Sequence, residues 1–96
     1  MSERIANIKR AIERKVGGIA THVGSKVVTE RFQGKIIWEG VVEMFDLAMN
    51  PKVKRCYAWM YRENGEMHYE TVNETEEVNS PELAVKEAIG TKSKEP

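Results

Sequence analysis

The dipeptide Asn64-Gly65 stands between two runs of residues that alternate in the manner of β-strands. Asn-Gly flanked by such runs is the strongest short-range signal of a β-hairpin, and it favours a two-residue type I′ turn. A turn of this length fixes the register of the two strands, so that Tyr57 lies opposite Val72. The sequence therefore predicts an antiparallel sheet that contains this hairpin.

Successive side chains of a strand point to opposite faces of a sheet, so the predicted hairpin divides into two sets of residues. One face is expected to carry Cys56, Ala58, Met60, Arg62, Met67, Tyr69 and Thr71. The opposite face is expected to carry Tyr57, Trp59, Tyr61, His68, Glu70 and Val72. Neither set is polar, so the pattern does not identify a face that is open to water.

The residues before the hairpin predict a helix followed by two strands. Behind Ser2, a candidate N-cap, isoleucines recur at spacings of three and four, which is typical of an amphipathic helix. Gly17-Gly18 is expected to end this helix. After a Gly-rich connector, β-branched and aromatic residues predict strands at residues 26–32 and 35–47, joined by a tight turn at Gln33-Gly34.

A second helix is predicted after the hairpin. Ser80-Pro81 combines an N-cap with proline at the first helical position, and the helix is expected to run to about Ile89, with Gly90 after its end. The order of elements predicts one α+β domain over residues 1–90. Its architecture is a two-layer sandwich with three or four antiparallel strands and both helices on one face of the sheet. Residues 91–96 are expected to form a flexible C-terminal tail.

The choice of buried face decides where a binding surface could lie. Cysteine, alanine and methionine are often buried or used to fill gaps in cores, so we expect the face of Cys56 to lie beneath both helices. The ring-bearing face would then be open, and tyrosine and tryptophan tolerate partial exposure. The predicted binding surface consists of Trp38, Tyr57, Trp59, Tyr61, His68 and Glu70. In the alternative arrangement the ring-bearing face is itself the core, or a long loop covers it.

The cellular compartment is inferred from cysteine content and hydropathy. One cysteine cannot form an intramolecular disulfide, which fits a reducing compartment. The charged N-terminal residues lack the apolar run of a signal peptide, and no run of about 18 apolar residues could span a bilayer. We therefore expect a cytoplasmic protein that does not bind membranes.

The nucleophilic and metal-ligating residue types do not form a recognisable site in the sequence. Cys56 and His68 fall on opposite faces of the predicted hairpin, which separates the thiol from this imidazole. His68 and Glu70 share a face, but one histidine with one carboxylate is far short of a metal-site signature. His22 lies in the Gly-rich connector with no motif around it. We therefore expect no catalytic residues, no metal and no cofactor.

The net charge is zero, but the charges are segregated along the chain. Residues 63–82 contain seven Glu and no Lys or Arg. The order helix, strands, helix is loosely similar to that of double-stranded RNA-binding domains, whose final helix begins with basic residues. Here that position holds Glu82, and without a positive field the attraction to phosphates is weak. Nucleic acid is therefore not the partner that we expect.

These observations favour a small non-catalytic interaction domain that binds a protein partner, or a second copy of itself as a homodimer, through the open face of its sheet. Two alternatives remain. One is a nucleic-acid-binding domain. The other is an inhibitor that presents an acidic surface to a basic nucleic-acid-handling protein, with the residues Glu63, Glu66, Glu70, Glu74, Glu76 and Glu77.

Overall fold

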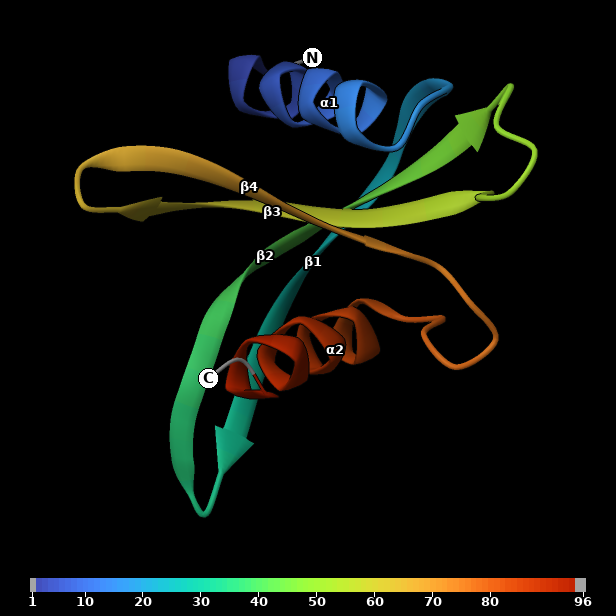
Figure 1. Cartoon of the computed structure of the whole chain (residues 1–96). Coiled ribbons are helices and arrows are strands. Elements are labelled where there is room, and N and C mark those ends of the chain that lie inside the picture. The colour runs from blue at the N-terminus through green and yellow to red at the C-terminus, as the bar shows by residue number, and fades with distance from the viewer. Residues whose placement is uncertain (1, 95–96) are drawn as a thin grey trace.

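The computed structural model describes the backbone of residues 2–94 and the side chains of residues 2–90. Four antiparallel strands form one sheet in the order β1-β2-β3-β4, with a helix before and a helix after them (Figure 1). The elements are α1 (Glu3–Lys15), β1 (Ile19–Phe32), β2 (Lys35–Ala48), β3 (Arg55–Glu63), β4 (Glu66–Asn73) and α2 (Pro81–Lys94). The predicted α+β class and the predicted element order are confirmed. Within the described residues, neither helix is long and apolar enough to cross a membrane.

Helix α1 begins and ends where its sequence predicts. The Oγ atom of Ser2 accepts a hydrogen bond from the backbone N–H of Ile5 at 3.2 Å, which satisfies one of the free donors of the first turn. Gly17 and Gly18 follow the helix with φ values of 95° and 90°. A Cβ atom on Gly18 would lie 2.5 Å from the carbonyl oxygen of Ala48. Glycine is therefore required at this approach of the chain to β2.

Both hairpins turn on two residues with positive φ, the backbone conformation of type I′ turns. The φ values are 53° and 80° at Gln33-Gly34 and 54° and 78° at Asn64-Gly65. Tyr57 pairs with Val72 in the second hairpin, so the predicted turn and register are confirmed.

Two element boundaries differ from the prediction. The Gly-rich connector is largely strand, because β1 begins at Ile19 and continues through a β-bulge between His22 and Gly24. Helix α2 does not stop at Ile89 but continues to Lys94. Gly90 has no positive φ, so it does not form the left-handed cap on which the predicted end depended. Four residues of the expected tail are thus helical, and residues 95 and 96 lie outside the described part of the chain.

The sheet is twisted so strongly that its two hairpins separate. Strand β2 pairs with β1 along nearly its whole length but with β3 only from Glu43 to Asp46. Residues 26–42 therefore form an arm, the β1–β2 arm, that extends past α2 (Figure 1). Strong right-handed twist is usual where a sheet is reduced to two strands.

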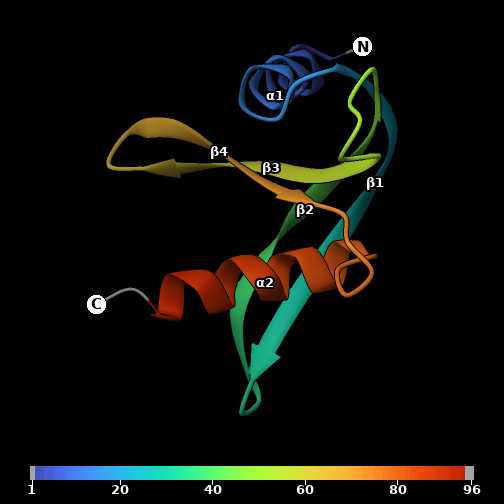
Figure 2. The same ribbon diagram turned by 45° about the vertical axis from the view of Figure 1, so that its right-hand side comes forward.

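The helices pack on opposite faces of the sheet, so the prediction that both lie on one face is wrong. Figure 2 shows α1 on one side of β3 and β4 and α2 on the other. The α1 core consists of Ile5, Ile8, Ile12, Ala20, Phe45, Leu47, Cys56 and Ala58. The α2 core consists of Val28, Val42, Tyr57, Trp59, Val78, Ala84, Val85 and Ala88. Because the centre of β3 is covered on both sides, neither face of the hairpin is polar there.

Candidate functional site

The aromatic residues that the sequence placed on an open face are covered by α2. Tyr57 is 1% exposed and Trp59 is 4% exposed. Their rings belong to the α2 core, where small residues of α2 such as Ala84 and Ala88 allow the helix to approach large side chains. The prediction that Tyr57 and Trp59 lie on an open surface is therefore wrong. The small residues that accommodate this packing come from the helix rather than from the strand.

The other predicted surface residues do not assemble into one patch around these rings. Trp38 is half-buried on the arm, and its ring meets that of Trp59 edge-on with centroids 5.4 Å apart. Tyr61 and His68 are cross-strand neighbours with stacked rings, also 5.4 Å apart. Glu70 is half-buried opposite Trp59. These contacts stabilise the hairpin and its junction with the arm.

The acidic stretch is likewise divided among different contacts. Glu74 accepts a hydrogen bond from the hydroxyl of Tyr57 at 2.9 Å. Burial and this carboxylate raise the pKa of Tyr57 to about 12, so the phenol stays protonated. Glu82 forms an ion pair with Lys26 of the arm, and this contact lowers the pKa of Glu82. Only part of the acidic stretch is thus available to a partner.

A buried carboxylate that the sequence did not single out joins α1 to the sheet. Glu43 is fully buried in β2. Its Oε2 atom lies 2.6 Å from Nη1 of Arg4, and its Oε1 atom lies 2.8 Å from Nε2 of His22. The hydroxyl of Ser25 donates a short hydrogen bond to the same Oε1 atom. Oε2 has no hydrogen bond of good geometry among the described residues, so its contact with Arg4 is chiefly an attraction between charges.

The Glu43 cluster contains Ser, His and Glu but lacks the geometry of a nucleophilic site. In such a site the histidine accepts the serine proton on one ring nitrogen and donates to the carboxylate from the other. Here Nε2 of His22 faces both Glu43 and Ser25, at 2.8 and 3.3 Å. Because a carboxylate only accepts, Nε2 donates to Glu43 and cannot also take the proton of Ser25. The arrangement is suited to holding α1 on the sheet.

The charge state of Glu43 follows from two opposing effects. Burial alone would raise the pKa of this carboxyl, but the contacts with Ser25, His22 and Arg4 together outweigh burial. The resulting pKa of Glu43 lies below the ordinary value of 4.5. The group is therefore a carboxylate at neutral pH, which keeps the ion pair with Arg4 intact.

The thiol of Cys56 lies in the environment of a core residue rather than of a reactive group. Cys56 is fully buried in the α1 core, and burial raises its pKa to about 11. A thiol in this state is a poor nucleophile, because the reactive form is the thiolate. Among the described residues, no group of three or more His, Cys, Asp or Glu side chains is placed to hold a metal ion.

Exposed apolar side chains concentrate on the β1–β2 arm. Val27 and Val41 are direct cross-strand partners, and they are 67% and 37% exposed. Their neighbours Val28 and Val42 face the opposite way and are buried beneath α2. Further exposed apolar residues of the arm are Phe32, Ile36 and Ile37. The sequence showed apolar residues on both faces of the strand at residues 35–47, but it could not show that α2 covers only one face of the arm.

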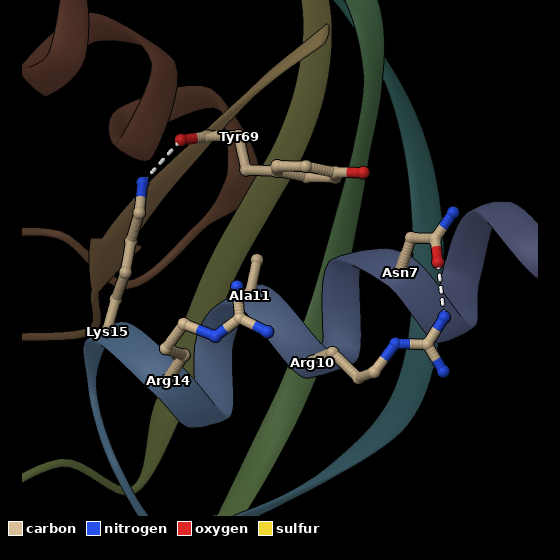
Figure 3. A pocket seen from close by; sticks show the side chains of 6 residues that line it. All are labelled: Asn7, Arg10, Ala11, Arg14, Lys15 and Tyr69. Carbon is tan, nitrogen blue, oxygen red and sulfur yellow. Dashed lines mark hydrogen bonds between the residues drawn. The ribbon is translucent and has the colours of Figure 1, made fainter.

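A hollow of about 260 Å³ lies between α1 and β4. Its lining consists of Asn7, Arg10, Ala11, Arg14, Lys15 and Tyr69, drawn in Figure 3. The ammonium of Lys15 donates to the backbone carbonyl of Tyr69 at 2.7 Å, and Arg10 donates to the side-chain oxygen of Asn7. None of the described residues that line this hollow is acidic. We call it the cationic hollow.

No protein-family model, curated protein or solved structure matches this chain.

Proposed function

We propose that this protein is a non-catalytic interaction domain that forms a homodimer through the face of the β1–β2 arm that α2 leaves uncovered. The observation that supports this proposal is the exposure of the cross-strand pair Val27 and Val41, at 67% and 37%. An isolated two-stranded hairpin is at best marginally stable in water, and here one of its two sides has no cover within the described chain. Covering that side with apolar surface would stabilise the arm.

A second copy of the chain is the occupant that the charges favour. The net charge is zero, so two copies do not repel each other strongly. On the same face of the arm, the next cross-strand pair toward the tip is Thr29 and Glu39. The hydroxyl of Thr29 donates a hydrogen bond to the carboxylate of Glu39 at 3.0 Å. The polar neighbours therefore satisfy each other. A two-fold axis near the valines would bring the same patch of both copies together and keep the two Glu39 side chains on opposite sides of that axis.

Sedimentation velocity over a concentration series tests this proposal. The wild-type chain is expected to sediment as a dimer at high concentration and to dissociate on dilution. The double variant Val27→Lys/Val41→Lys is expected to remain monomeric, because four ammonium groups would meet in the interface. Met67→Lys is the matched control, since it changes another exposed apolar strand residue at the far hairpin and should leave association unchanged.

The proposal is rejected if the wild-type chain is monomeric throughout the series, or if the control dissociates as readily as the arm variant. Circular dichroism spectra of all three proteins show whether they are equally folded. Retention of the wild-type protein on heparin, lost on mutation of basic residues but not of the valines, would instead favour the nucleic-acid alternative.

A further inference from the structure

We propose that the cationic hollow is a binding site for a small phosphate monoester. This inference concerns a different surface from the arm, because the hollow lies between α1 and β4 and is lined by residues of these two elements. Two guanidinium groups and one ammonium group line it, and these are the side chains that bind phosphate oxygens in proteins.

The three cations line one hollow and have no acidic partner in any of the described ion pairs. The described ion pairs use Arg4, Lys9, His22, Lys26 and Arg55 as their basic partners. None of them includes Arg10, Arg14 or Lys15. Arg10 and Arg14 are four residues apart on α1, where like charges destabilise a helix. The same helix carries opposite charges at the same spacing at Lys9 and Glu13, which form an ion pair at 2.8 Å. An anion bound in the hollow would offset the repulsion between the guanidinium groups of Arg10 and Arg14.

The helix dipole explains in part, without any ligand, why cations gather near the end of α1. Cations in the last turn of a helix are stabilised by its negative end, and Arg14 and Lys15 occupy the last turn of α1. Arg10 lies one turn earlier, where this effect has faded. The dipole corresponds to about half an elementary charge, so it opposes a bound anion much less than three full positive charges attract it.

The geometry of the side chains favours a phosphate that is attached to a small organic group. Arg10 donates a hydrogen bond to Asn7, and Lys15 donates one to the Tyr69 carbonyl, so two of the three cations have a preferred position before binding. Figure 3 shows Ala11 and the ring of Tyr69 facing each other across the hollow, which offers apolar contact to a carbon skeleton. A volume of about 260 Å³ lies slightly below the range of about 300–1,000 Å³ for drug-sized ligands. The ligand is therefore expected to be small.

Titration of the full chain with inorganic phosphate, phenyl phosphate and sulfate tests this assignment. Amide and arginine Nε–H chemical shifts in heteronuclear NMR spectra report the binding. Phenyl phosphate is expected to bind more tightly than inorganic phosphate or sulfate, since only its ring can contact Tyr69. The shifts should centre on Arg10, Arg14 and Tyr69.

The decisive comparison is between Arg14→Gln and Arg62→Gln. Each variant removes one exposed guanidinium, but Arg62 lies at the end of β3 and does not line the hollow. Arg14→Gln is expected to weaken the binding of phenyl phosphate by about tenfold or more, the effect of losing one charged hydrogen-bond donor. Arg62→Gln should change it less than about twofold.

Equal weakening in both variants would overturn the proposal, because it would indicate a diffuse charge effect. The absence of saturable shifts with either phosphate compound would also overturn it. A short single-stranded RNA serves as a further probe, since it contains the same phosphate chemistry in a polymer. Tight binding of the RNA with no saturable binding of phenyl phosphate would exclude a site for a small monoester.

Discussion

Cys56 and Tyr57 are adjacent in β3, and their side chains lie in two separate cores. Cys56 packs against α1 and is fully buried, whereas Tyr57 packs against α2 and is 1% exposed. The centre of β3 is thus buried on both faces, with α1 on one side and α2 on the other. Strands buried on both faces read as nearly continuous apolar runs, which is the pattern that β3 shows.

Replacement of Trp59 by alanine should destabilise the protein strongly. Its ring fills the α2 core and meets Trp38 edge-on. The expected loss in the free energy of unfolding is about 3 to 5 kcal/mol, as for other buried aromatic residues that are truncated to alanine. Urea denaturation followed by circular dichroism measures it. Met67→Ala, at an exposed position outside the arm, should cost less than about 1 kcal/mol. A loss below about 1 kcal/mol for Trp59→Ala would contradict the assignment of this ring to a core.

The local features of the fold were predictable because they depend on nearby residues. The Ser2 cap, the Gly17-Gly18 stop and both two-residue turns are each determined by the chemistry of a few consecutive positions. The register of the second hairpin followed from its turn alone. The face on which each helix packs was not predictable from nearby residues, because it depends on how the loop after β4 directs α2. An apolar pattern on both sides of β3 was compatible with either arrangement.

The candidate sites were less predictable than the fold. The Glu43 cluster depends on two long-range contacts: the pairing of β1 with β2 places His22 and Ser25 beside Glu43, and the docking of α1 adds Arg4. Its one sequence signal was the position of Glu43 on the same strand face as Phe45, where a buried carboxylate requires partners. The cationic hollow had a comparable signal in the spacing of Arg10 and Arg14, but the contribution of Tyr69 required the packing of β4 beside α1.

Substitution of Gln33 by asparagine should stabilise the first hairpin. Gln33 has a φ of 53°, a left-handed conformation that asparagine adopts several-fold more readily than glutamine. The expected gain in the free energy of unfolding is about 0.5 to 1 kcal/mol. The second hairpin offers the reciprocal control, because Asn64 has a φ of 54° in the same setting. Asn64→Gln should lose a similar amount in thermal or urea denaturation. A loss of stability for Gln33→Asn, or a gain for Asn64→Gln, would refute this account.

The ion pair between Arg4 and Glu43 should make stability depend on acidic pH. The pKa of Glu43 is lower in the folded than in the unfolded chain, so its contribution is present above about pH 4.5 and is lost as the pH falls through the folded-state value. Arg4→Gln is expected to cost about 1 to 3 kcal/mol at neutral pH, since it leaves a buried carboxylate with fewer partners. The difference from wild type should shrink below pH 4.5 in urea titrations. Arg62→Gln serves as a control that should show no such pH dependence. A constant difference for Arg4→Gln at all pH values would disprove the linkage.

The thiol of Cys56 should resist alkylation for as long as the protein is folded. Its pKa of about 11 leaves about one molecule in ten thousand as thiolate at neutral pH, and its side chain is fully buried beneath α1. Iodoacetamide labelling, followed by mass spectrometry, is expected to be about 100-fold slower or more than in the urea-unfolded chain. Met67→Cys adds an exposed thiol on the neighbouring strand, and that thiol should react rapidly in the same sample. If Cys56 reacted as fast as this added cysteine, α1 would have to leave the sheet frequently, and the Glu43 cluster could not be holding it there.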